Sequence, residues 1–111
     1  PDCTFLRVHF GYDQAGLTAE ASDAIVERMA CYQAGTGTIR IEGHADERGT
    51  TDYNLALGQR RADAVARHLV AQGVARTRVQ TLSYGEERPL NPGHDEAAWA
   101  DNRLADIHAA M

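Results

Sequence analysis

Apolar and polar side chains alternate with a period of two in short stretches of this chain, a pattern typical of β-strands with one buried face. We expect four strands: residues 4–10, 38–44, 78–84 and 103–108. The alternation is cleanest in the second stretch, where Ile39 and Ile41 share a face. In the last stretch it is weaker and places Ala105 and Ile107 inward.

Two longer stretches instead repeat their apolar residues at helical spacing. The first begins after a capping residue, Thr18, and is expected to run to about Tyr32. Its apolar positions are Leu17, Ala21, Ala24, Ile25 and Met29. The second runs from about Thr51 to Gln72 and stops at Gly73. Its expected buried stripe is Leu55, Ala62, Val65, Ala66 and Leu69.

The order of elements predicts the fold class. One more helical turn is expected at residues 95–100, within a loop that holds most of the prolines. The resulting order, β-α-β-α-β-(α)-β, predicts an α/β (α+β) two-layer sandwich with two main helices packed on one mixed sheet. At 111 residues, the chain is expected to form a single domain over residues 1–111.

Composition excludes several classes of function. The formal charge is −5, with 16 acidic against 11 basic residues, which disfavours binding to nucleic acid or to anionic lipid. The apolar residues make up 43% of the chain, yet no run approaches the roughly 20 residues that span a bilayer. We therefore expect no transmembrane segment in this chain.

The two cysteines, Cys3 and Cys31, lie at the expected start of the first strand and end of the first helix. A helix that runs back along the strand brings these positions together, so a disulfide is one interpretation. Two unpaired core thiols are the alternative. A third interpretation, Cys3 as a lipid attachment site, is disfavoured because the first strand begins at once.

The segment 43–62 carries the candidate site. It leaves a strand, turns, and enters a helix on which Asn54, Leu57 and Arg61 share one face, apart from the expected buried stripe. Asp46 lies in the loop that leads into this helix. A carboxylate and a guanidinium at one place suit a zwitterionic ligand such as an amino-acid head group. The alternative is an Asp46–Arg61 salt bridge that orders the loop.

Several motifs resemble one known family. The stretches are VHFGYDQAGLT, GHADERGTTDYN, LGQRRADAV, YGEERP and GHDEAAWADNR. Together they resemble the OmpA-like peptidoglycan-binding domain, in particular its peptidoglycan-associated lipoprotein (Pal) members. The resemblance covers residues 8–107, nearly the whole chain.

The resemblance implies a non-catalytic module that binds the meso-diaminopimelate of the peptidoglycan stem and tethers an outer-membrane or envelope protein to the wall. It implies that Asp46 and Arg61 clamp that residue, and it gives secondary roles to Phe10, Arg48, Asn54 and Leu57. It also implies the periplasmic side of the outer membrane. The alternative is a scaffold for a TolB-like periplasmic partner, with Glu86, Glu87 and Arg88 as candidate contacts. No cofactor is implied.

Two positions depart from the family pattern. Gly11 stands where the family usually has an acidic residue, and Leu104 stands where it has a second arginine after Asn102 and Arg103. We expect the final strand to be a short or rearranged edge of the sheet.

Other polar clusters have simpler interpretations. The five histidines show no ligand spacing typical of zinc, so we expect no metal site and expect His44 and His94 to form hydrogen bonds in loops. Asp95 and Glu96 are interpreted as a helix start rather than a catalytic pair. Trp99 is expected to pack the short helix, with sugar stacking as the alternative.

Overall fold

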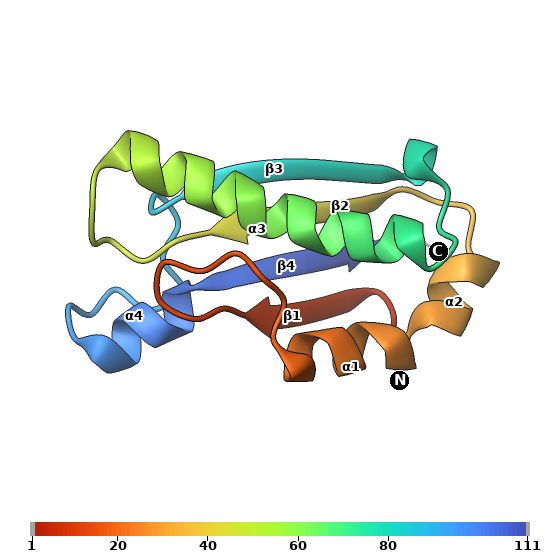
Figure 1. Ribbon diagram of the computed structural model, residues 1–111, viewed down its shortest axis with the longest axis horizontal. Helices are drawn as coiled ribbons and strands as arrows, with labels where there is room; N and C mark the ends of the chain where they lie inside the picture. Colours follow the sequence, from red (N-terminus) through yellow and green to blue (C-terminus); the bar gives the residue numbers. More distant parts are fainter. Residues whose placement is uncertain (1, 111) are drawn as a thin grey trace.

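All four predicted strands and the long second helix are present in the computed structural model, which describes residues 2–110 (Figure 1). The elements, in chain order, are β1 (Phe5–His9), α1 (Ala19–Glu27), α2 (Met29–Ala34), β2 (Ile39–His44), α3 (Thr51–Ala71), a 3-10 turn η1 (Arg76–Arg78), β3 (Val79–Gly85), α4 (Glu96–Asn102) and β4 (Leu104–Ala109). The predicted mixed sheet with helices on one face is confirmed.

The strands lie in the order β1-β4-β2-β3, with β2 and β3 parallel and the other neighbouring pairs antiparallel. The last strand, β4, therefore lies inside the sheet. The expectation of a short or rearranged edge was wrong, because all of residues 104–108 pair with β1 and residues 105–109 pair with β2. A central strand gains ladder hydrogen bonds on both sides, which compensates for its weak β propensity.

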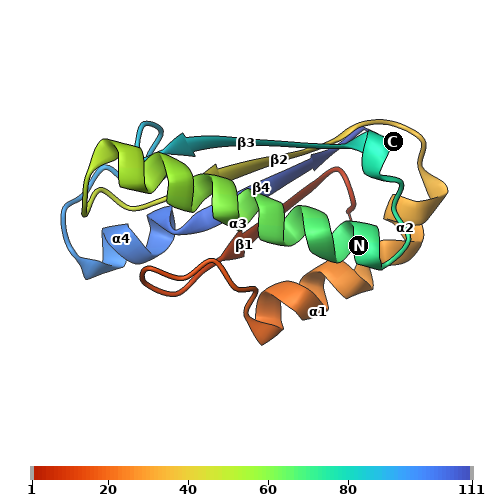
Figure 2. The same ribbon diagram turned by 45° about the horizontal axis from the view of Figure 1, so that its top comes forward.

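The helices cover one face of this sheet (Figures 1 and 2). The long helix α3 crosses β2 and β3, and α1 lies beside β1. Between the two layers lies a continuous apolar core whose fully buried members include Ile25, Tyr32, Ile39, Ile41, Val65, Leu69, Ala105 and Ile107. No helix within residues 2–110 combines the length and apolar character needed to cross a bilayer.

The first predicted helix is broken into α1 and α2 at Arg28. This residue adopts φ −102° and ψ 0°, and its backbone N–H donates to Ile25 rather than continuing the α pattern. Its guanidinium donates to the carbonyl oxygens of Ala24 and Asp2, at 2.8 and 3.1 Å. The side chain thereby fixes the bend, which periodicity alone does not reveal.

The buried face of α3 differs from the predicted stripe. Leu55 is 45% exposed, while Asn54, Leu57 and Arg61 are buried together with Ala62. The face that looks polar in the sequence is thus turned toward the protein. The prediction that Arg61 lies apart from the buried side was wrong.

A glycine pair sets how α3 lies on β2. A side chain on Gly43 would clash with the carbonyl oxygen of Gly58, so these two backbones meet directly. The chain then turns at Gly49, whose φ of 99° favours glycine, and Thr50 caps α3 by accepting from the N–H of Tyr53 at 3.1 Å. This close approach brings the loop after β2 onto the first turns of α3.

A disulfide joins Cys3 to Cys31, with their Cα atoms 6.4 Å apart. It ties the chain before β1 to α2, as the run-back geometry predicts. Both sulfurs are consumed, which leaves no thiol at Cys3 for a lipid. The two cysteines are 28 residues apart in the sequence. For a closed loop of this length, the chain-entropy model gives a disulfide about 3.5 kcal/mol of stabilisation.

Candidate functional site

A pocket of about 250 Å³ lies where the loops after β1 and β2 meet the start of α3. Four of the residues predicted from sequence line it: Asp46, Arg48, Asn54 and Leu57. Four lining residues were not predicted as ligand contacts: Tyr12, Asp13, Gly49 and Tyr53. The other two predicted ligand contacts, Phe10 and Arg61, lie behind this lining.

Asp46 is 6% exposed at the pocket and is held by Arg48. One carboxylate oxygen accepts from the backbone N–H and the Nε of Arg48, at 3.0 and 3.1 Å, and the other accepts from its terminal nitrogen at 2.9 Å. A terminal nitrogen of Arg103 lies 3.9 Å away. Asp46 therefore pairs with Arg48 and not with Arg61, and the alternative of an Asp46–Arg61 salt bridge was wrong.

Arg48 is sandwiched between two aromatic rings. Its guanidinium carbon lies 4.1 Å from the ring centre of Tyr12 and 4.2 Å from that of Trp99. Stacking of this kind keeps the planar group in place while its edge bonds Asp46. Trp99 in turn donates its indole N–H to Glu47 at 2.8 Å. Trp99 thus packs on the site through Arg48.

Asn54 fixes the loop after β2. Its side-chain nitrogen lies 3.0 Å from the carbonyl oxygens of both Asp46 and Arg48, and 2.8 Å from a carboxylate oxygen of Glu86. The residue is 1% exposed, so these bonds replace water for the buried amide. Asn54 therefore shapes the pocket and links it to the long loop after β3.

Arg61 is fully buried beneath the loop after β1. Its three nitrogens donate to the carbonyl oxygens of Gln14, His44 and Gly11, at 2.8, 2.8 and 3.2 Å. Its guanidinium carbon lies 5.3 Å from the ring centre of Phe10, which is also buried. Burial lowers the pKa of Arg61 to about 10, so the group remains a cation at neutral pH. Arg61 thus ties the first loop to the end of β2.

The contacts of the two residues that depart from the family pattern, Gly11 and Leu104, are structural. Gly11 contributes its carbonyl oxygen to Arg61, a contact that any residue can make. Leu104 is buried at the start of β4, where it pairs with His9. Neither position lines the pocket.

One contact at the pocket rim was missed by sequence reasoning. The hydroxyl of Tyr53 bonds the carboxylate of Asp13, which closes the first loop onto α3. Asp13 has φ 56°, a left-handed conformation that aspartate tolerates better than most residues. A short segment with an aspartate between two glycines is a turn signal, but the partner of Asp13, forty residues away, is set only by the fold.

The remaining polar residues mostly behave as expected. His94 pairs with Glu47 at 2.8 Å, and Asp95 caps α4 by accepting from the N–H of Ala98 at 2.9 Å. His44 was expected to form a hydrogen bond in a loop. It is instead the last residue of β2, and its Nε2 is buried without a hydrogen-bond partner among residues 2–110. A larger groove, about 530 Å³, lies between α3 and β3; half of its lining residues are alanine or valine, and its charged residues are Asp63, Arg67 and Arg76.

The protonation of Asp46 gives a testable dependence on pH. Burial opposes its ionisation, but the hydrogen bonds from Arg48 outweigh burial and hold its pKa below the ordinary 3.8. A carboxyl whose pKa is lowered on folding stabilises the protein above the unfolded value and loses this contribution as the pH falls through the folded value. We expect Asp46→Asn to destabilise the fold at neutral pH and to cost progressively less below about pH 4.

Urea unfolding of the wild type and of Asp46→Asn across this range measures the difference directly. The other carboxyl groups titrate in the same way in both proteins, so their contributions cancel in the difference between the two free energies of unfolding. A difference in unfolding free energy that stays constant down to about pH 2 would contradict the assignment.

Comparison with known proteins places this chain in a family. Residues 9–103 match the model of the OmpA family. The chain is 46% identical over 99 residues to the peptidoglycan-associated lipoprotein of Pseudomonas aeruginosa, covering 89% of this chain and 59% of that protein. It is 48% identical over 99 residues to the protein of that name from Pasteurella multocida, covering 88% and 66%. The chain thus spans about three fifths of the length of these relatives.

A solved structure agrees with these matches. The crystal structure of the peptidoglycan-associated lipoprotein from Burkholderia pseudomallei superposes with a TM-score of 0.89 at 40% identity, covering 92% of this chain and 87% of that one. Sequence and fold therefore agree, and the chain belongs to the OmpA family.

Proposed function

We propose that this domain binds peptidoglycan through the meso-diaminopimelate of its peptide stem and so tethers an envelope protein to the cell wall. The observation that supports this most directly is the pocket around Asp46, a buried carboxylate with the guanidinium of Arg48 at 2.9 Å and that of Arg103 at 3.9 Å. The relatives named peptidoglycan-associated lipoprotein support the wall as the target. The domain then lies on the periplasmic side of the outer membrane.

The chemistry of the ligand fits the pocket. The side chain of meso-diaminopimelate ends in an ammonium and a carboxylate on one carbon. Asp46 accepts the ammonium through Oδ2, because Arg48 donates only one hydrogen bond to that oxygen and leaves it a second lone pair. Arg48 lines the pocket with its side chain 29% exposed, so its guanidinium is open to the ligand carboxylate.

Arg61 is less accessible to the ligand than Asp46 and Arg48 are. A guanidinium has five N–H groups, and the three bonds to backbone carbonyls leave two of them for a ligand. Because Arg61 has no exposed surface, a ligand carboxylate reaches it only when the loop that holds Gly11 and Gln14 shifts. In this proposal the clamp of Asp46 and Arg61 forms fully on binding.

A cosedimentation experiment tests wall binding. Purified sacculi that contain diaminopimelate are expected to pull the domain into the pellet, and free diaminopimelate-containing stem peptide is expected to release it. The supernatant is also assayed for muropeptides, because a wall hydrolase releases fragments on long incubation and a binding module does not. Failure to pellet, or steady release of fragments, would contradict the proposal.

A protein partner is the second candidate, and the link between Asn54 and Glu86 favours it. This 2.8 Å contact joins the pocket wall to the loop that carries Glu87 and Arg88. We propose that a TolB-like periplasmic protein that binds this loop shares the pocket region. Competition between such a partner and the stem peptide supports a shared surface, and independent binding of both contradicts it.

A further inference from the structure

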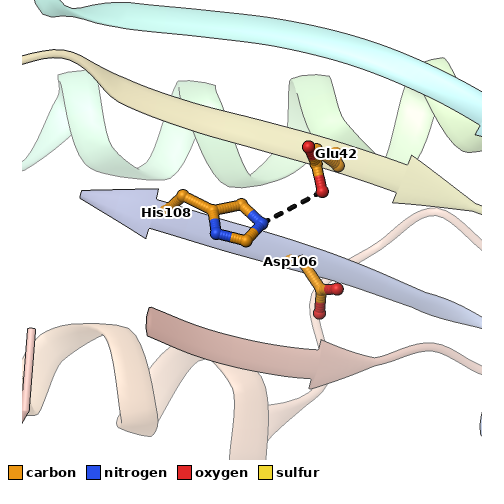
Figure 3. A group of neighbouring side chains, drawn as sticks. All are labelled: Glu42, Asp106 and His108. Atoms are coloured by element: carbon orange, nitrogen blue, oxygen red, sulfur yellow. Dashed lines mark hydrogen bonds and ion pairs between the residues drawn. The ribbon is translucent and has the colours of Figure 1, made fainter. Parts of the chain in front are cut away.

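A second cluster of polar side chains lies on the open face of the sheet, away from the helices and the pocket (Figure 3). It consists of Glu42 on β2 and of Asp106 and His108 on β4. One oxygen from each carboxylate and one imidazole nitrogen all lie within 4.8 Å of one another. The shortest contact joins a carboxylate oxygen of Glu42 to Nε2 of His108, at 3.0 Å.

Strand register places two like charges opposite each other. Glu42 and Asp106 are direct partners in the antiparallel β2–β4 ladder, where facing carboxylates repel. Their side chains are only 12% and 11% exposed, so water screens this repulsion weakly. A pair of carboxylates held in this way favours a cation between them.

Two arginines hold the outer edges of these carboxylates. Arg7 donates to both oxygens of Asp106, at 2.7 and 3.0 Å, and Arg40 donates to one oxygen of Glu42 at 3.0 Å. Hydrogen bonds to ligating carboxylates are the usual outer support of a metal site, because they fix the ligand atoms and leave lone pairs free. The other oxygen of Glu42 is the one that faces His108.

A buried nitrogen beside the cluster has no partner. His44 follows Glu42 by two residues on the same strand and is 8% exposed, and its Nε2 forms no hydrogen bond within residues 2–110. A buried imidazole nitrogen without a partner is uncommon.

We propose that Glu42, Asp106 and His108 bind a divalent transition-metal ion, with Zn²⁺ as the best match. Zn²⁺ accepts imidazole nitrogen and carboxylate oxygen as ligands, so two carboxylate oxygens, one imidazole nitrogen and a water complete a four-coordinate site. Ligands at about 2.1 Å from one ion lie roughly 3.4 Å apart, so the cluster closes on the ion by side-chain movements of about 1 Å. The ion links β2 to β4, the two central strands.

Zinc titration by calorimetry tests the site on the wild type and on three variants. His108→Ala removes the nitrogen ligand, and Glu42→Gln keeps the shape of the side chain while removing its charge. His94→Ala is the matched control. His94 also pairs with a glutamate at 2.8 Å, but it lies in the loop before α4 and is not part of the cluster. Circular dichroism of each zinc-free variant verifies that it is folded.

We expect one zinc ion per wild-type chain and an equal affinity for His94→Ala. The affinity is expected to fall about tenfold or more in both His108→Ala and Glu42→Gln. Zinc is also expected to raise the melting temperature of the wild type and not that of His108→Ala. No binding to the wild type, or an unchanged affinity in folded His108→Ala, overturns the proposal, as does a loss confined to His94→Ala.

Discussion

Replacing Arg61 by alanine is expected to lower the free energy of unfolding by about 3–5 kcal/mol, the largest effect on stability that this fold predicts for a residue at the site. The guanidinium donates to three backbone carbonyls, of Gly11, Gln14 and His44. Without it these acceptors lose their donors in a buried place, and a cavity opens against Phe10. Urea unfolding at neutral pH measures the change.

Arg61→Met separates the two causes. Methionine fills most of the volume but cannot donate, so it is expected to recover the part of the loss that comes from the cavity alone. An Arg61→Ala protein that loses less than about 1 kcal/mol would contradict the role of Arg61 in holding the first loop to β2. Wall binding by Arg61→Ala is therefore interpreted only under conditions where the variant is folded.

Replacing Asp46 by asparagine is expected to weaken wall binding by about tenfold to a hundredfold. A charged contact to a ligand ammonium contributes about 1.5–3 kcal/mol, and an amide cannot supply it. The substitution also frees Arg48, which the carboxylate holds through three hydrogen bonds. Cosedimentation with sacculi at increasing wall concentration gives the change in affinity.

Asp23→Asn is the matched control for this experiment. Asp23 is an exposed carboxylate on α1, so its loss changes the net charge by the same amount without touching the pocket. We expect its affinity for sacculi to equal that of the wild type. Equal affinities for Asp46→Asn and Asp23→Asn would show that binding depends on overall charge and not on Asp46.

Much of the fold follows from periodicity. The strands that contain Ile39 and Ile107 alternate over several residues, and α3 begins directly after Thr50, a residue type that caps helices. The place of β4 inside the sheet does not follow, because strand order depends on long-range pairing. The break at Arg28 does not follow either, since it rests on side-chain bonds to carbonyls that the fold brings near.

The site was predicted in part for similar reasons. Asp46 and Arg48 stand in a loop between a strand and a helix, where polar groups converge by geometry. The spacing of apolar residues along the helix predicts a buried stripe on another side and so places Arg61 away from the core. It is buried here because three carbonyl groups replace the water around its guanidinium. A count of apolar residues along α3 cannot reveal those carbonyls.

The disulfide illustrates what topology adds to sequence. The positions of Cys3 and Cys31 suggested a pairing only when a helix running back along the first strand was assumed. The structure has this arrangement, and the two residues are joined although the helix between them is broken at Arg28. The linkage tolerates the break because α2 turns its Cys31 side toward the start of β1.

The central claim is that the pocket recognises both charges at the end of the diaminopimelate side chain. A calorimetric titration of the wild type with a stem peptide that contains meso-diaminopimelate, beside the same peptide with lysine, tests it most directly. The lysine peptide keeps the ammonium for Asp46 but lacks the carboxylate for the arginines. We predict that it binds about ten- to a hundredfold more weakly. Equal affinities for the two peptides, or no binding of either, would contradict the claim.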